Sequence, residues 1–332
     1  MPPSSPTQTV SMTRVRRWYT LALAVWVGRP WTPGESGVMR IHKIASGLGC
    51  PDGPARFPDG GVAFGKTYRS QVSAYRDGRG VEQFWSTGRG PSVTTLGSGG
   101  FRCVTRSEGF DGPCQTAAPR PRPIQRVAAD ARVEVLLTEV DSVCLRAPNH
   151  SVFGPDERLH FTDPGLCEAD RPDALGCVFA LDTYGATEVL AETPSVNPNG
   201  IVAESDGSCV RVEPFTPTAR RSRAGSEVTL QRVLDNPAPV PDGLTLDGKG
   251  GVPVMATSSG GMNALRPDGR SPKFLPVGHV PTNCAFGPGG RLSATNGEHS
   301  GTASADWAGS LIERSLLARG RPRTHGCSTG QV

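Results

Sequence analysis

The sequence has few aromatic residues, little net charge and no clustered basic face. Aromatic side chains make up 6% of the 332 residues, and 35 Lys and Arg against 31 Asp and Glu leave a formal charge of +4. Because the basic residues are scattered except near the two ends, we expect no nucleic-acid partner. The apolar run Trp18 to Val27 is too short to cross a bilayer, so we expect no membrane span either.

Motifs for several common chemistries are also missing. The nine cysteines are widely spaced and contain no Cys-x-x-Cys pair, which argues against a disulfide framework and against a zinc site. Neither Ser92 nor Ser151 lies in a Gly-x-Ser-x-Gly elbow, so a Ser-His-Asp triad is not indicated. Several cysteines stand where an apolar strand residue would serve, and we expect these to be buried free thiols: Cys103, Cys177, Cys209 and Cys284.

Turn-forming residues, by contrast, are abundant. The chain has 42 Gly and 31 Pro, together 73 of its 332 residues, as many short strands joined by turns require. The clearest unit is Pro148 to Gly165. It begins with a proline and polar or small residues, continues through a mostly apolar stretch and a Gly/Pro/Asp turn, and ends in an alternating strand. This pattern predicts a short antiparallel hairpin.

The start of this unit, which we name the Pro motif, occurs six times. The six copies begin at Pro51, Pro91, Pro148, Pro198, Pro241 and Pro281. Successive copies are 40, 57, 50, 43 and 40 residues apart, the length of one four-stranded propeller blade. The sequence therefore predicts an all-β, six-bladed β-propeller, with four antiparallel strands per blade around a central metal-binding channel. The long second interval contains no seventh Pro motif, so residues 107–123 are interpreted as a surface excursion.

The expected propeller spans residues 39–320, and a strand from Ile41 to Ile44 is expected to complete the last blade and close the ring. Residues 1–38 are predicted to be an extension that is disordered or signal-like, and residues 321–332 a basic tail. Arg16 and Arg17 ahead of an apolar run resemble an export signal, but no small-x-small cleavage site follows Val27. These features favour a cytoplasmic location, with export as the alternative.

Polar residues in the Pro motifs are the candidates for a functional site. Inner strands of a propeller surround one axis, so equivalent positions of different repeats converge. The polar residues are Asp52, Ser92, Asn149, Asn199, Asp242, and either Thr282 or Asn283. Two carboxylates and two or three amides suit a hard cation such as Ca²⁺, with Mg²⁺ or Mn²⁺ as alternatives. Asp and Asn after Pro also form turns by binding their own backbone, but the recurrence in phase favours the metal.

These motifs resemble the senescence-marker-protein/gluconolactonase/luciferin-regenerating family of six-bladed propellers, over about residues 39–320. The run from Asn149 to Gly165 is close to the bacterial gluconolactonase form, and the other motifs match by order and spacing. The resemblance implies hydrolysis of sugar lactones or related esters. It also implies a divalent metal, usually calcium, held by a Glu, two Asn and an Asp on the central axis.

Carried over by position, the resemblance implies the metal ligands Asp52, Asn149, Asn199 and Asp242. Asp52 stands where the family usually has Glu, which is one methylene longer. His150 replaces an Asp, and Ser92 replaces an Asn. Because the departures lie at the site itself, a weakened or altered activity is an open alternative. Zn²⁺ is a further alternative to Ca²⁺ as the bound ion.

The implied reaction is opening of a sugar lactone, in which the cation polarises the ring carbonyl and water attacks. Asp242 is the candidate general base, and the pure-ligand role is the alternative. The residues His150, Ser92, Asn283 and Glu213 are the candidates for substrate contact, whereas His160 is expected to be packed. Two other functions stay open: a non-catalytic propeller that binds a ligand or protein, and a hydrolase of other esters or phosphoesters. The sequence carries no signal for oligomeric state.

Overall fold

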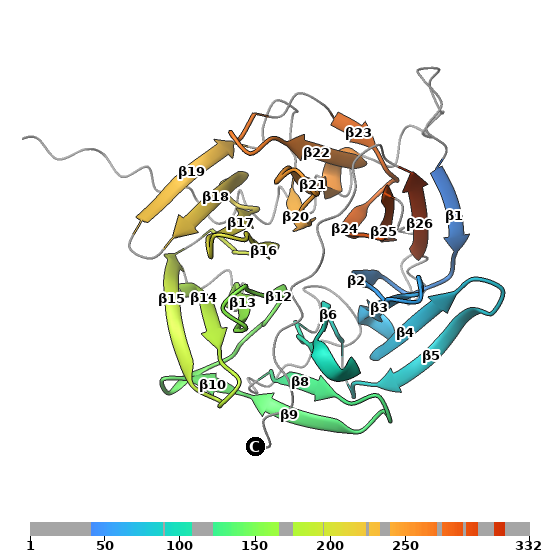
Figure 1. Ribbon diagram of the computed structural model, residues 1–332, viewed down its shortest axis with the longest axis horizontal. Helices are drawn as coiled ribbons and strands as arrows, with labels where there is room; N and C mark the ends of the chain where they lie inside the picture. Colours follow the sequence, from blue (N-terminus) through green and yellow to red (C-terminus); the bar gives the residue numbers. More distant parts are fainter. Residues whose placement is uncertain are drawn as a thin grey trace, which may run out of the picture.

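Six four-stranded antiparallel sheets surround a common axis in the computed structural model (Figure 1). The structure describes residues 41–88, 90–107, 122–165, 175–194, 196–223, 226–232, 240–270, 274–287, 290–297 and 309–315. This arrangement confirms the predicted all-β, six-bladed propeller. No helix among these residues is long and apolar enough to cross a membrane. The predicted extension 1–38, most of the predicted excursion 107–123, and the tail 321–332 lie outside the described residues.

Five blades are built from strands that follow one another in sequence. Blade 1 comprises β2 (Pro51–Arg56), β3 (Val62–Lys66), β4 (Gln71–Arg76) and β5 (Gly80–Ser86). Blade 2 comprises β6 (Thr94–Leu96), β7 (Arg102–Val104), β8 (Ile124–Val127) and β9 (Val133–Leu137). Blade 3 comprises β12 (Ser151–Phe153), β13 (Leu159–Asp163), β14 (Leu175–Leu181) and β15 (Thr187–Pro194).

The remaining blades follow the same plan. Blade 4 comprises β16 (Ile201–Ala203), β17 (Cys209–Glu213), β18 (Thr218–Arg223) and β19 (Ser226–Arg232). Blade 5 comprises β20 (Pro241–Leu244), β21 (Val252–Ala256), β22 (Gly261–Leu265) and β23 (Phe274–Pro276). Blade 6 comprises β24 (Pro281–Phe286), β25 (Arg291–Gly297), β26 (Gly309–Ser315) and β1 (Ile41–Ala45). A short hairpin, β10 (Glu139–Val140) and β11 (Val143–Cys144), lies between blades 2 and 3 in sequence.

The ring is closed by β1, the first described strand, which pairs with β26 as the outer strand of blade 6. This confirms the closing role predicted for residues 41–44. Because one sheet then contains both ends of the described chain, the first and last blades cannot separate without breaking a ladder of backbone hydrogen bonds.

Side chains of neighbouring blades pack face to face to form the core. The largest cluster joins blades 2 and 3 and includes Ile124, Phe161 and Phe179, none more than 2% exposed. The four cysteines predicted to be buried free thiols are buried and free: Cys103, Cys177, Cys209 and Cys284. Burial raises the pKa of each of these thiols, so they serve as small apolar groups.

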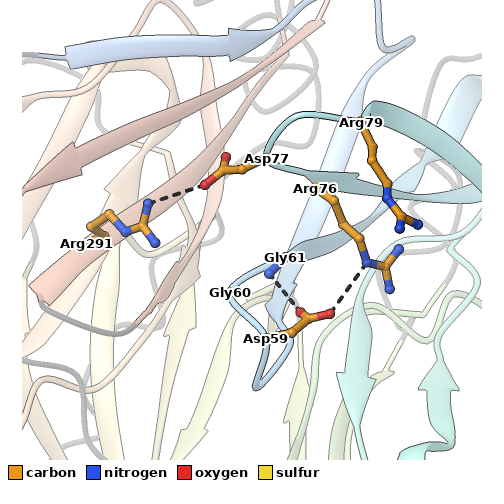
Figure 2. Close-up of a pocket in the computed structure, with 7 residues that line it drawn as sticks. All are labelled: Asp59, Gly60, Gly61, Arg76, Asp77, Arg79 and Arg291. Atoms are coloured by element: carbon orange, nitrogen blue, oxygen red, sulfur yellow. Dashed lines mark hydrogen bonds and ion pairs between the residues drawn. The ribbon is translucent and has the colours of Figure 1, made fainter.

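Charged residues also join blades 1 and 6 at the closing seam. The buried guanidinium of Arg56 in β2 is ion-paired with Glu313 in β26. Beside it, a surface basin of about 360 Å³ is lined by residues of both blades (Figure 2). In this basin Arg76 faces Asp59 at 3.5 Å, and Arg291 faces Asp77 at 3.9 Å. Blades 1 and 6 are therefore joined by charge pairing, in addition to the β1–β26 pairing that completes blade 6.

We expect Glu313→Ala to weaken the ring, because it leaves the Arg56 guanidinium buried without its partner. Breaking a buried pair from one side costs about 3–5 kcal/mol, and partial exposure of Glu313 places the expected loss near the lower end. Urea denaturation measures the loss. The matched control is Glu82→Ala, which removes an exposed partner of Arg76 and should cost under about 1 kcal/mol. Equal losses for the two variants would contradict a structural role of the seam pair.

Candidate functional site

The polar residues of the six Pro motifs lie at one end of the inner strands and meet across blade boundaries. The Ser92 hydroxyl lies 3.2 Å from Asp52 Oδ2 and 2.5 Å from Asn149 Oδ1. The Asn149 Nδ2 amide donates to Asn199 Oδ1 at 2.9 Å. Residues that are 40, 57 and 50 positions apart in the sequence thus form one connected row over blades 1 to 4.

Blades 5 and 6 complete this row. Asn199 hydrogen-bonds to Asp242, and Asn283 hydrogen-bonds to Asp52. These hydrogen bonds only partly oppose the rise in carboxyl pKa that burial causes at both aspartates. Each blade therefore contributes one residue to a ring about the axis, which we name the axial ring: Asp52, Ser92, Asn149, Asn199, Asp242 and Asn283. The structure brings all of these predicted site residues together. Both alternatives in the sixth motif contact Asp52: Asn283 is the ring member, and Thr282 also hydrogen-bonds to Asp52, while its hydroxyl lies 2.9 Å from the Pro51 carbonyl oxygen.

Close backbone approach explains the glycines that follow the ring residues. A Cβ on Gly53 would lie 2.4 Å from the Val93 Cα, and a Cβ on Gly200 would lie 2.3 Å from the Asp242 carbonyl oxygen. Gly53 also has a φ of +53°, which L side chains rarely adopt. Its N–H donates to Asp52 Oδ1 at 2.7 Å, so one carboxylate oxygen forms the turn and the other faces Ser92. The turn-forming and site-forming roles of Asp52 therefore coexist.

The two carboxylates of the axial ring have unfavourable electrostatics. Asp52 and Asp242 keep a partly exposed surface, while Ser92, Asn149, Asn199 and Asn283 are buried. Burial raises the pKa of both carboxyl groups, and the negative charge of Asp52 raises the pKa of Asp242 further. Burial, and then the negative charges of Asp52 and Asp242, raise the pKa of the neighbouring Cys50 thiol. The site thus concentrates negative charge that its own residues do not neutralise.

His150 closes the axis beside this ring. Its Nε2 lies 3.4 Å from Asn283 Oδ1, and these residues belong to blades 3 and 6, which face each other across the six-bladed ring. The imidazole is buried, and burial lowers the pKa of His150 to about 4, so the side chain is neutral at pH 7. Because the His150 side chain is buried and reaches across the axis, it forms a wall of the site.

The donor set fits a hard cation. Its donors are carboxylate, amide and hydroxyl oxygens, and the single Ser92 proton cannot be donated to both oxygens that lie within reach of it. A cation at the ring would relieve this crowding and the repulsion between Asp52 and Asp242. Among the described residues, no three His, Cys, Asp or Glu side chains form a metal cluster, so amide oxygens would have to complete the coordination.

Two further predicted positions lie away from the ring. Glu213, expected at the substrate-facing rim, is 1% exposed and ion-paired with Arg211 at 3.0 Å and Arg220 at 2.8 Å. Its carboxylate is therefore engaged inside blade 4. His160, expected to be packed, is buried with Nε2 3.0 Å from Asp156.

Sequence reasoning missed two neighbours of the ring. Thr257 donates to Asp242 Oδ2 at 3.3 Å from η4 (Thr257–Ser259), the 3₁₀ turn after β21. Cys50 immediately precedes the first Pro motif, and Tyr68 hydrogen-bonds to its thiol. The position of Cys50 directly before the first Pro motif could have identified it as a neighbour of the axial ring. Nothing in the sequence marks Thr257, because its contact depends on how the turn after β21 folds back.

We expect Asp242→Asn to stabilise the metal-free protein at neutral pH. The folded-state pKa of Asp242 is raised, so its carboxyl group stabilises the fold most below the unfolded pKa of about 4. That contribution is lost as pH rises through the folded pKa. The variant has no carboxyl group at this position, so with chelator at pH 8 it should be more stable than wild type, and the difference should shrink toward pH 4. Thermal denaturation across this range is the measurement, and a less stable variant at pH 8 would contradict the repulsion.

Comparison with known proteins identifies the family and supports the fold. The model of the SMP-30/Gluconolactonase/LRE-like region matches residues 50–294. No curated protein matches the chain.

Solved structures of similar fold include a gluconolactonase from Xanthomonas campestris, with 18% identity over 84% of this chain and 89% of that chain and a TM-score of 0.67. A luciferin-regenerating enzyme is 16% identical over 86% of this chain and 98% of that chain, also with a TM-score of 0.67. The calcium-binding protein regucalcin from Agrobacterium tumefaciens is 15% identical over 84% and 94%, with the same TM-score. Because the family model matches residues 50–294, which is most of the propeller, the chain belongs to the SMP-30/gluconolactonase/LRE-like family.

Proposed function

We propose that this protein is a metal-dependent hydrolase that opens a sugar lactone. The observation that carries the proposal is the axial ring, in which two carboxylates and two amides from four different blades converge and the charge of Asp52 raises the pKa of Asp242. The family match over residues 50–294 supports a lactonase-type propeller. Solved structures of similar fold include a gluconolactonase and a calcium-binding protein.

The residues that would hold the metal are Asp52, Asn149, Asn199 and Asp242. Their oxygen donors favour Ca²⁺, with Mn²⁺, Mg²⁺ and Zn²⁺ as alternatives. When bound, the ion supplies Lewis-acid polarisation of the lactone carbonyl and stabilises the negative charge that develops on its oxygen. The amide oxygens of Asn149 and Asn199 each retain a second lone pair beside the present hydrogen bond, so these contacts do not prevent coordination.

Asp242 is the residue proposed to accept a proton from the attacking water. The water oxygen bonds to the carbonyl carbon, the bond from that carbon to the ring oxygen breaks, and the ring oxygen takes up a proton. The products are a carboxylic acid and an alcohol on one open chain. The Thr257 hydroxyl, 3.3 Å from Asp242 Oδ2, fixes the orientation of this carboxylate.

The other ring residues are proposed to bind substrate. Ser92 and Asn283 present polar groups on either side of Asp52, and neutral His150 forms a wall across the axis. A small neutral or polar ligand can hydrogen-bond to such groups. The wall also limits how far a ligand can enter along the axis.

We expect wild type to hydrolyse one or more aldonolactones above the metal-only control. A pH-stat screen with each metal measures this. Asp242→Asn should reduce kcat by about 10²-fold or more, because it removes the proposed base and a ligand charge. Asp52→Glu should keep or raise the activity, since it restores the ligand length usual in the family. If wild type binds metal yet hydrolyses no lactone, a non-catalytic binding propeller replaces this proposal.

We expect calorimetry on chelator-stripped protein to show one site for a divalent cation. Asp242→Ala should abolish that site, because half of the available carboxylate charge is lost. Asp268→Asn is the matched control, since Asp268 lies in an exposed turn of the same blade and should leave binding unchanged. Tight binding that survives Asp242→Ala would show that other residues hold the ion.

A further inference from the structure

The surface basin between blades 1 and 6, which we name the seam basin, is lined by three arginines, two aspartates and two glycines of the described chain (Figure 2). Arg76 and Arg79 come from the end of β4 and the turn that follows it, and Arg291 begins β25. The volume of about 360 Å³ lies in the range of small-molecule sites.

The seam basin is separate from the axial ring. Strand β2 begins at the axial ring with Pro51 and Asp52 and ends at Arg56, next to the turn that contributes Asp59 to the seam basin. The two sites therefore lie at opposite ends of the inner strands. A ligand in the seam basin does not have to be the substrate of the axial ring.

The guanidinium of Arg76 is oriented by carboxylates that stand some distance from it. Its Nε lies 3.5 Å from Asp59 Oδ2, and its Nη1 lies 3.6 Å from Glu82 Oε2. A close charge-assisted hydrogen bond between such groups is about 2.7–2.9 Å long. The Gly61 N–H donates to Asp59 Oδ1 at 3.0 Å, so the turn itself holds the Asp59 carboxylate. These long contacts attract Arg76 without saturating its N–H donors.

Arg291 borders the open part of the seam basin. Its Nη1 lies 3.5 Å from Glu313 Oε2 and 3.9 Å from Asp77 Oδ2. Its other terminal nitrogen, Nη2, lies 3.9 Å from the position that a Cβ on Gly60 would occupy. Nothing else in the described chain lies within 4 Å of that position apart from the neighbours of Gly60 itself. The Nη2 group therefore faces free space above Gly60.

A further positive charge lies behind Arg76. The guanidinium carbons of Arg102 and Arg76 lie 4.9 Å and 5.0 Å from the centre of the same Phe57 ring. Burial, and then the charge of Arg76, lower the pKa of Arg102 to about 10, so Arg102 remains charged at pH 7. The charged groups linked by these contacts are five arginines and four carboxylates: Arg56, Arg76, Arg79, Arg102 and Arg291, and Asp59, Asp77, Glu82 and Glu313.

We infer that the seam basin binds a phosphate group, either free or as the monoester of a small molecule. Three guanidiniums reach one cavity from two blades, and each presents its donors in a planar fork. A tetrahedral phosphate dianion offers oxygens to several forks at once, whereas a carboxylate offers two oxygens in one plane. The phosphate would join Arg76 and Arg79 of blade 1 to Arg291 of blade 6, so its binding stabilises the closed ring.

Calorimetry on the full chain at low salt, without added metal, tests the inference with three probes: inorganic phosphate, glycerol 3-phosphate and glycerate. We expect one site for phosphate and for glycerol 3-phosphate, and weaker binding of glycerate, which carries a carboxylate in place of the phosphate. Tighter binding of glycerol 3-phosphate than of inorganic phosphate identifies a monoester as the ligand. Equal binding identifies free phosphate.

Substitutions of the lining residues should change this binding in opposite directions. Arg79→Gln and Arg291→Gln should each weaken phosphate binding on the order of fivefold, because each removes charged donors. Asp77→Asn should strengthen it, because a negative charge that competes for Arg291 is removed. The matched control is Arg270→Gln, in an exposed turn of blade 5, where Arg270 lies 3.8 Å from Asp268. This variant should keep the wild-type affinity.

Thermal denaturation gives a second readout. Phosphate should raise the Tm of wild type and of Arg270→Gln, and should raise that of Arg79→Gln much less. Arg79 lies in an exposed turn, so its substitution should leave the fold intact. Wild type that binds no phosphate at millimolar concentration, glycerate that binds as tightly as glycerol 3-phosphate, or unchanged binding in Arg79→Gln would overturn the inference. None of these outcomes bears on lactone hydrolysis at the axial ring.

Discussion

The pairing of β1 with β26 is the interaction on which the rest of the structure depends. It joins the two ends of the described chain in one sheet and so holds six blades at fixed angles about one axis. Residues that are 40 to 57 positions apart can then meet at hydrogen-bonding distance, as Asp52, Ser92 and Asn149 do. The buried pair of Arg56 and Glu313 reinforces the same seam. The site is thus a consequence of closure, since no single blade contains it.

Closure also explains how a stable fold maintains an unfavourable site. Asp52 and Asp242 repel each other in a partly desolvated position. Such costs persist only where the surrounding structure determines the positions, which packing between the blades and the backbone contacts of Gly53 and Gly200 achieve here. A cation at the axial ring would relieve this repulsion.

Much of this arrangement could be predicted from the sequence because it repeats. The Pro motifs placed the inner strands and their ring residues, and residues 41–44 were expected to close the last blade. Contacts that occur once could not be predicted. His150 reaches across the axis to Asn283, and Thr257 hydrogen-bonds to Asp242 from a 3₁₀ turn. Glu213 forms ion pairs with two arginines of its own blade. These contacts depend on how particular turns and rotamers pack, and no period in the sequence encodes that.

The central claim is that the axial ring is a metal centre formed by four blades. Diffraction from crystals soaked in Ca²⁺, with data collected at a wavelength where calcium scatters anomalously, tests it most directly. The account predicts one anomalous peak on the axis, about 2.3–2.6 Å from oxygens of Asp52, Asn149, Asn199 and Asp242. An axis without a peak at saturating Ca²⁺, or a peak bound only by residues outside the ring, would contradict it.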